Sequence, residues 1–510
     1  MSKRYQISKG RVEAKTTKFT QKFRDGSRQK IVLFKKAVCG LALAFSITAC
    51  GGDHHEKKLS KSANLNHRVT GYVGSVAADE PQAAMLARDI LIRGGNAADA
   101  ATALGMALTV TLPSRASLGG GGACLAYHPG QPAQSIIFLP QAGRKPSSNS
   151  DRPAAIPMMA RGLYLLQASY GKSDINDILR LVGNLAGNGA PVSDTLASDL
   201  AAVQQPLFED SAMQRAFTNV NGLPLKAGDI LYQPRLKIIY DRLISAGIAD
   251  LYIGSLARSY ALGSQIAGGG LYNEDFRNAL PVQTSALSLT QGQNITYFLS
   301  PPADGGLGMA MAMHNGQNRD DVAQGTVAKW RAENSSTYLK SSIEGMTKKA
   351  QDWLDNGKAG SDSLPALPAL PASTSFVVVD RDGGAVSCAL TMNNLFGTGR
   401  ISGTTGIVMA ASPRQLPPPL LTGSISTYKQ RFIAGVSASG QNDAAQEAAV
   451  TMNSFLNKQG NKREKDVSLP NSSGSKGRVN AVYCSDGLPG NDRQCHAYTD
   501  PNGMGLAISR

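Results

Sequence analysis

ASTSFVVVDRDGGAVSCALTM, residues 372–392, places a serine and a threonine at the head of an apolar run that follows a proline-rich linker. The run that ends at Asp380 is rich in β-branched residues and predicts a strand, and Ala385 to Met392 predicts a second strand. Arg381-Asp382-Gly383-Gly384 between them are turn formers, so the two strands are predicted to form a β-hairpin. A strand that opens with a hydroxyl side chain after a linker is where an N-terminal nucleophile would sit.

The register of this hairpin can be estimated from its turn. If Asp382 and Gly383 form the loop, Ser373 lies opposite Thr391 or Met392 and next to Asn393. Two hydroxyl groups and an amide would then converge at one end of the hairpin.

A serine at the start of a chain could supply its own base. The hydroxyl is a weak nucleophile until a base removes its proton, and a cut before Ser373 would expose an α-amine with an unperturbed pKa of about 8. The preceding segment 356–372 contains LPALPALP and is predicted to lack regular structure, which suits cleavage.

Three groups of residues carry a resemblance to a known family. The hairpin together with Phe396-Gly397-Thr398-Gly399 resembles the small subunit of the gamma-glutamyltransferases. GGNAADAA at 94–101, followed by Pro113 and by LGGGG at 118–122, is similar to the amino-terminal signature of that family. Pro301-Pro302 with Gly305-Gly306 resembles a third family element, and the motifs stand in family order from about Val73 to the C-terminus.

The resemblance implies a fold and a set of roles. Periodicity alone predicts only a mixed α and β protein, whereas the family implies an α+β fold, the four-layer αββα sandwich of the N-terminal-nucleophile hydrolases. The implied catalytic residues are Ser373 as nucleophile, where the family uses threonine, Thr391, and the Ser439-Gly440 pair as donors to an oxyanion. Implied substrate-binding residues include Asn393, Thr374 and Thr422. The resemblance implies no metal and no other cofactor.

The pocket that would hold the acyl group departs from the family pattern. The arginine that clamps the substrate carboxylate is replaced by Pro140, for which Arg144 or Arg115 could substitute. The acidic residue that holds the substrate amino group has no clear counterpart in 410–414, and the paired serines of the family fall on Leu421-Thr422. Loss of a bidentate clamp weakens the orientation of the substrate in the site, so glutathione is a doubtful substrate. A different amide, such as an acylated amine, is an alternative substrate.

The N-terminal region resembles a bacterial lipoprotein signal. Residues 1–36 hold twelve Lys and Arg against two acidic residues, which accounts for +10 of the net charge of +15, so a nucleic-acid partner is disfavoured. Ala37 to Ala49 is apolar but too short to span a bilayer, and small residues precede Cys50, the predicted lipidation site. The expected location is the periplasmic side of a bacterial membrane, with lipid as anchor.

The predicted organisation follows from these features. It comprises a leader at 1–49, a flexible tether at 50–72, a large-subunit-like region at 73–355, the linker with a candidate cleavage site at 356–372, and a small-subunit-like region at 373–510. The two cleaved pieces are expected to stay associated.

Cysteine usage fits an oxidising compartment. Beyond the leader and Cys50, the chain has Cys124, Cys388, Cys484 and Cys495. Cys484 and Cys495 flank a turn-rich loop, so a disulfide between them is predicted. A zinc site is less favoured because the chain has no CxxC pair.

Two segments near the start of the large-subunit-like region have helical character. They are 83–92 and 97–110, with Asn96 as candidate N-cap of the second. Gly119 to Gly122 lack the following Lys-Ser or Lys-Thr of a phosphate loop, so a close backbone approach beside a strand at 123–127 is the better interpretation.

Three functions remain open from the sequence. The first is a self-cleaving amidohydrolase or acyltransferase that moves a γ-glutamyl or related acyl group to water or an amino acceptor. The second is a catalytically degenerate relative that acts as a lipid-anchored binding or scaffold protein. A periplasmic solute-binding lipoprotein ranks last, because nothing in the chain resembles its two-lobed repeat.

Overall fold

The computed structural model describes residues 68–144, 150–314, 322–334, 342–357, 372–414, 420–459, 469 and 477–509. All of them belong to one compact unit that spans Ser60–Arg510. The predicted leader, Cys50, most of the tether and almost all of the linker lie outside the described residues. No helix within the described ranges has both the length and the apolar character that a membrane span needs.

Two antiparallel sheets form the centre of this unit. The first has the strand order β17-β1-β11-β12-β2-β3-β8, with bounds β17 Leu506–Ser509, β1 Gly74–Ala78, β11 Ser373–Asp380, β12 Ala385–Thr391, β2 Gly121–Tyr127, β3 Gln134–Phe138 and β8 Val282–Ser285. The second has the order β16-β15-β14-β13-β10-β9, with bounds β16 Cys495–Thr499, β15 Arg478–Leu488, β14 Arg431–Ser439, β13 Thr422–Tyr428, β10 Asn294–Phe298 and β9 Leu287–Gln291.

The predicted hairpin lies in the middle of the first sheet. β11 and β12 pair antiparallel with Ser373 opposite Thr391, which confirms the predicted register to within its one-residue range. β12 continues the sheet through β2, where Thr391 faces Gly121. The head of β11 and the end of β12 therefore share one edge of the sheet.

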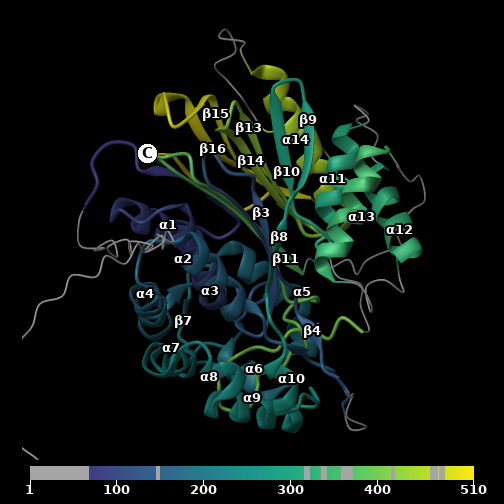
Figure 1. Ribbon diagram of the computed structural model, residues 1–510. Helices are drawn as coiled ribbons and strands as arrows, with labels where there is room; N and C mark the ends of the chain where they lie inside the picture. The colour runs from purple at the N-terminus through teal and green to yellow at the C-terminus, as the bar shows by residue number, and fades with distance from the viewer. Residues whose placement is uncertain are drawn as a thin grey trace, which may run out of the picture. The chain divides into compact units, whose positions relative to one another are not determined.

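Helices cover the outer faces of both sheets (Figure 1). α1 (Pro81–Ile92), α2 (Ala97–Thr111) and α3 (Met159–Tyr170) pack on the first sheet, in a core that includes Phe376 and Leu390. The second sheet packs on α11 (Gly305–His314), α13 (Ile343–Asp355) and α14 (Ala444–Lys458), and α12 (Val322–Asn334) packs on α11 and α14 in the same core. Val377 and Ile425 belong to a third core between the sheets. The predicted α+β fold, an αββα sandwich, is confirmed.

The other helices and two short strand pairs extend the helical layer that covers the first sheet. They are α4 Ile175–Asn188, α5 Asp194–Leu207, α6 Ser211–Ala216, α7 Pro234–Ala246, α8 Asp250–Ile253, α9 Ser255–Ile266, α10 Asn273–Arg277, and the strand pairs β4 Gln141–Ala142 with β5 Ala155–Ile156 and β6 Ala190–Pro191 with β7 Ile230–Leu231. The 3-10 turns belong to the second sheet's side: η1 Gln441–Asp443 leads from β14 into α14, and η2 Asp492–Gln494 connects β15 to β16.

Local sequence explains the second helix. Asn96 caps α2 by accepting from the Asp99 N–H, while the Asp99 carboxylate accepts from the Asn96 N–H, which is a complete capping box. Every residue of α2 is buried, as its nearly continuous apolar sequence predicts. α2 thus begins where predicted and ends one residue beyond the predicted end.

Two disulfides lie on adjacent strands. Cys484 and Cys495 join β15 to β16, the pairing that the sequence favoured. Cys124 and Cys388 stand directly opposite each other on β2 and β12 and form the second bond. This second disulfide connects the large-subunit-like region to the small-subunit-like region.

Candidate active site

Ser373 begins β11 and is almost completely buried, with 1% of its surface exposed. Its Oγ has no hydrogen-bond partner among the residues that the structure describes. A buried hydroxyl normally finds a partner, and an exception calls for an explanation such as a chemical role.

The carbonyl group just before Ser373 is held by two donors. The Ala372 oxygen accepts from Thr391 Oγ1 at 2.9 Å and from the Met392 N–H at 3.2 Å. Thr391 Oγ1 in turn accepts from the Asn393 N–H at 2.8 Å, so its own proton is directed at the Ala372 oxygen. The peptide bond between Ala372 and Ser373 is therefore polarised next to a hydroxyl that has no partner in the part of the chain that the structure describes.

Asn393 follows the end of β12 in a fixed conformation. Its φ of +59° is in the left-handed region, which asparagine tolerates better than most residues. Its side-chain Nδ2 donates to the Ala411 oxygen at 2.9 Å, and the Ala411 N–H donates to the Met392 oxygen at 3.0 Å. The structure thus brings Asn393 to the same end of the hairpin as Thr391.

Ser439 and Gly440 lie where β14 ends. Gly440 has a φ of +101°, which glycine adopts without strain and other residues avoid. Ser439 Oγ donates to Asp79 Oδ2 at 3.0 Å, and Thr374 Oγ1 donates to the same atom at 3.0 Å. One carboxylate oxygen therefore joins Thr374, the neighbour of the predicted nucleophile, to the predicted oxyanion pair.

Sequence reasoning missed Asp79. Only the pairing of β1 with β11 brings Asp79 beside the strand that begins with Ser373, because Ala78 pairs with Phe376 and Asp79 follows immediately. Its neighbour Glu80 is buried and caps α1 by accepting from the Ala83 N–H at 2.7 Å. Burial raises the pKa of the Glu80 carboxyl above its usual value, an effect that the hydrogen bond from Ala83 opposes. The signal in the sequence that could have pointed to Asp79 is the acidic pair Asp79-Glu80 directly before the start of α1.

Thr422 and Pro140 both lie within the sandwich near sheet ends. Thr422 begins β13, is buried, and donates from Oγ1 to the Leu420 oxygen at 3.3 Å. Pro140 packs against Gly121, where an added Cβ would lie 3.0 Å from the proline ring. Since Gly121 pairs with Thr391, Pro140, which the resemblance predicted to replace the arginine of the family, adjoins this site.

Neither arginine considered as a replacement is free. Arg115 is held in a two-point contact with Asp199, from Nε and from one terminal nitrogen, at 2.8 Å each. The Arg144 side chain is 62% exposed, donates to the Glu274 oxygen, and lies 3.7 Å from Asp275. A substrate carboxylate would have to compete with these partners.

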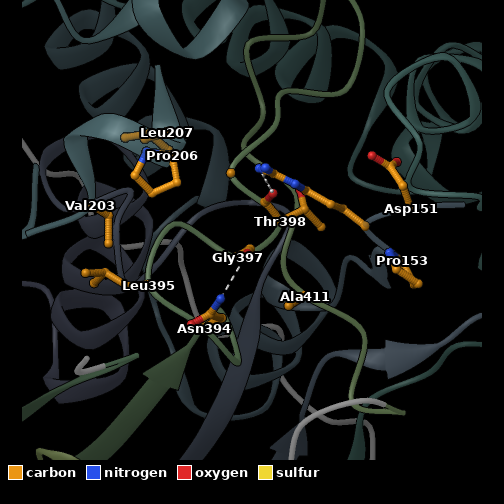
Figure 2. Close-up of a pocket in the computed structure, with 12 residues that line it drawn as sticks. Asp151, Pro153, Val203, Pro206, Leu207, Asn394, Leu395, Gly397, Thr398 and Ala411 are labelled. Atoms are coloured by element: carbon orange, nitrogen blue, oxygen red, sulfur yellow. Dashed lines mark hydrogen bonds between the residues drawn. The ribbon is translucent and has the colours of Figure 1, made fainter. Parts of the chain in front are cut away.

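A cavity of about 370 Å³ borders the loop that follows β12 (Figure 2). Asn394, which follows Asn393, and Ala411, whose oxygen accepts from Asn393 Nδ2, both line the cavity. The cavity therefore lies next to Asn393. The opposite wall is apolar and comes from α5, as Figure 2 shows for Val203, Pro206 and Leu207. Its size falls in the range of sites for small organic molecules.

Known proteins resemble this chain in sequence and in fold. The family model described as Gamma-glutamyltranspeptidase matches residues 83–352. A glutathione hydrolase proenzyme from Escherichia coli (strain K12) is 30% identical over 386 residues, which cover 67% of each chain. One from Bacillus subtilis (strain 168) is 26% identical over 437 residues, 73% of this chain and 74% of that protein.

A solved structure supports the fold assignment. The cephalosporin acylase from Bacillus halodurans superposes with a TM-score of 0.66 at 19% identity, over 87% of this chain and 97% of that one. At this identity the likeness concerns the fold alone. The family match and the sequence relatives carry the assignment further: the chain belongs to the gamma-glutamyltranspeptidase family.

Proposed function

We propose that the chain cuts itself before Ser373 and that the new N-terminal serine then transfers a γ-glutamyl or related acyl group to water or an amino acceptor. Family membership makes γ-glutamyl transfer or hydrolysis its reaction class. The observation that carries the proposal is the buried Ser373 Oγ, which has no partner within the described ranges, beside an Ala372 carbonyl that accepts two hydrogen bonds.

The cut can be written as a balanced sequence of steps. Ser373 Oγ attacks the Ala372 carbonyl carbon, and the charge that develops on the oxygen is stabilised by Thr391 Oγ1 and the Met392 N–H. The C–N bond breaks, the acyl group moves from nitrogen to oxygen, and the proton of the hydroxyl ends on the released amine. Water then hydrolyses the ester, which leaves a carboxylate on Ala372 and a free α-amine on Ser373.

In turnover the same residue supplies nucleophile and base. The Ser373 α-amine takes the hydroxyl proton as Oγ attacks the donor amide, and the leaving amine receives that proton. The resulting ester passes its acyl group to water or to an amine. In this proposal Ser439-Gly440 bind the oxyanion, and Thr391 and Asn393 position the nucleophile and the substrate.

The residues around the site favour acyl groups other than γ-glutamyl. Pro140 cannot donate to a carboxylate, and Arg115 and Arg144 are engaged by Asp199 and by Glu274 with Asp275. We therefore propose that Asn393, Thr374 and Thr422 contribute polar contacts to the donor, and that donors without a glutamyl α-carboxylate are accepted as well as γ-glutamyl compounds.

The first test is the mass of the purified mature protein. With reductant, we expect two pieces, the smaller beginning at Ser373. Without reductant, we expect a single cross-linked species, because Cys124 and Cys388 fall on different pieces. The cut protein is then assayed with γ-glutamyl-p-nitroanilide and with simple acyl anilides.

The mass measurement tests both the self-cleavage and the disulfide between the two pieces. A single uncut chain under reducing conditions would sink the self-cleavage proposal and favour the non-catalytic binding or scaffold alternative. Two pieces that separate without reductant would contradict the cross-link. A variant with both Cys124 and Cys388 changed to serine is the matched control, and it should separate without reductant once denatured.

We also propose that Cys50 carries lipid and holds the protein on the periplasmic side of a bacterial membrane. The support is the sequence Ile47-Thr48-Ala49-Cys50 after a basic and then apolar leader. Cys50→Ala should move the protein from the detergent-soluble membrane fraction to the soluble fraction and remove the lipid mass from its N-terminal peptide. A Cys50→Ala protein that still carried lipid would exclude this anchor.

A further inference from the structure

Asp79 receives four side-chain or backbone donors at the end of β1. Its Oδ2 accepts from Thr374 Oγ1, the Ser375 N–H and Ser439 Oγ, each at 3.0 Å. Its Oδ1 accepts from Asn480 Nδ2 at 2.7 Å. These donors come from β11, β14 and β15, so the carboxylate bridges the two sheets of the sandwich.

The contacts are placed around the residues proposed to react. Thr374 and Ser375 directly follow Ser373, and Ser439 directly precedes Gly440. Asn480 also donates from Nδ2 to the Ser375 oxygen and to Ser375 Oγ, each at 3.0 Å, which ties β15 to the same strand. A shift of Asp79 would therefore move the nucleophile relative to the oxyanion pair.

The cap of α1 and the attachment of β1 to the sheet do not depend on Asp79. Glu80 rather than Asp79 caps α1. Backbone pairing from Gly74 to Ala78 already holds β1 against β11. An ionised carboxylate accepts hydrogen bonds only, and bonds to a charged acceptor are about twice as strong as neutral ones. Asp79 is suited to fix several donors at once.

We propose that Asp79 is a positioning residue that holds Ser373 at its working distance from Ser439 and Gly440. This inference rests on the proposed function of those residues. It differs from a general contribution to folding because its effect passes through Ser439 and concerns the reacting step rather than substrate binding.

The test starts with Asp79→Asn, which keeps the shape and removes the charge and one acceptor oxygen. A misplacement of about 1 Å can cost about 10²-fold in rate, so we expect kcat per cut molecule to fall by about 10- to 100-fold. KM should stay within about threefold, because Asn393 and Thr422 do not contact Asp79 and Thr374 can still donate to the amide oxygen that remains in Asp79→Asn. A folded Asp79→Asn chain that stays uncut also supports the assignment, since the cut uses the same hydroxyl.

Ser439→Ala is the second variant. It keeps the Asp79 charge and the backbone of β14 but removes the hydrogen bond from Ser439 Oγ to Asp79 Oδ2. If Asp79 acts through Ser439, the losses of the two single variants do not multiply in the double variant. Asp382→Asn, in the exposed turn of the same hairpin, is the matched control and should turn over normally.

The outcomes separate this inference from the proposed function. An uncut and inactive wild-type protein would refute the proposed function itself. A cut and active wild type, together with an Asp79→Asn variant whose kcat is within threefold of it, would overturn the role of Asp79 alone. Losses that multiply in the double variant, or a Ser439→Ala variant with unchanged kcat, would overturn it as well.

Discussion

Replacing Ser373 with alanine is expected to leave one uncut chain and to lower amidase turnover by at least about 10³-fold. The substitution removes the hydroxyl that attacks the Ala372 carbonyl, and the amine that would serve as base stays in the peptide bond. Both losses have one cause, so they should appear together. Reducing mass spectrometry and release of p-nitroaniline from γ-glutamyl-p-nitroanilide measure them.

Ser387→Ala is the matched control for Ser373→Ala. Ser387 is also a buried strand serine of this hairpin, but its Oγ donates to the Val436 oxygen at 3.0 Å. Its loss removes one buried hydrogen bond and leaves the proposed chemistry intact, so the protein should be cut and active. A Ser373→Ala variant with full amidase activity would remove the proposed nucleophile.

Thr391→Val is expected to slow the self-cut by about 10²-fold, the usual cost of losing one donor to an oxyanion. Valine keeps the shape of the side chain but cannot donate to the Ala372 oxygen. It also leaves the Asn393 N–H without its acceptor. The measurement is the fraction of cut chains over time after synthesis, read under reducing conditions.

Thr427→Val separates this effect from the general cost of a buried hydroxyl. Thr427 Oγ1 donates to the Ile295 oxygen at 3.2 Å at the other end of β13, away from the hairpin edge. We expect its cut to proceed at the wild-type rate. Equal rates for Thr391→Val and the wild type would mean that the hydrogen bond to Ala372 has no part in the cut.

Local sequence predicted much of the frame of this site. The Asp382-Gly383 turn determines the register of the hairpin, so the sequence alone predicts Ser373 opposite Thr391 or Met392, and the structure pairs Ser373 with Thr391. The cap at Asn96 was equally local, since its partner Asp99 is three residues away. Such features depend on short-range geometry alone.

Contacts made across the fold could not be predicted in this way. The partners of Asp79 that lie in β11, β14 and β15 are 295, 360 and 401 residues away. The Cys124 to Cys388 pairing spans 264 residues and depends on β2 lying beside β12. The resemblance predicted that Pro140 stands in place of an arginine, but only the fold shows that Arg115 is occupied by Asp199.

The order of strands in the first sheet determines whether the protein folds before or after the proposed cut. From one edge, β17 belongs to the smaller proposed piece, β1 to the larger, β11 and β12 to the smaller, and β2, β3 and β8 to the larger. β1 of the larger piece lies between β17 and β11 of the smaller piece, and β12 of the smaller piece pairs with β2 of the larger, so neither piece can form this sheet without the other. In the proposed order of events, the two sets of strands therefore assemble while the polypeptide is still whole, and the cut follows.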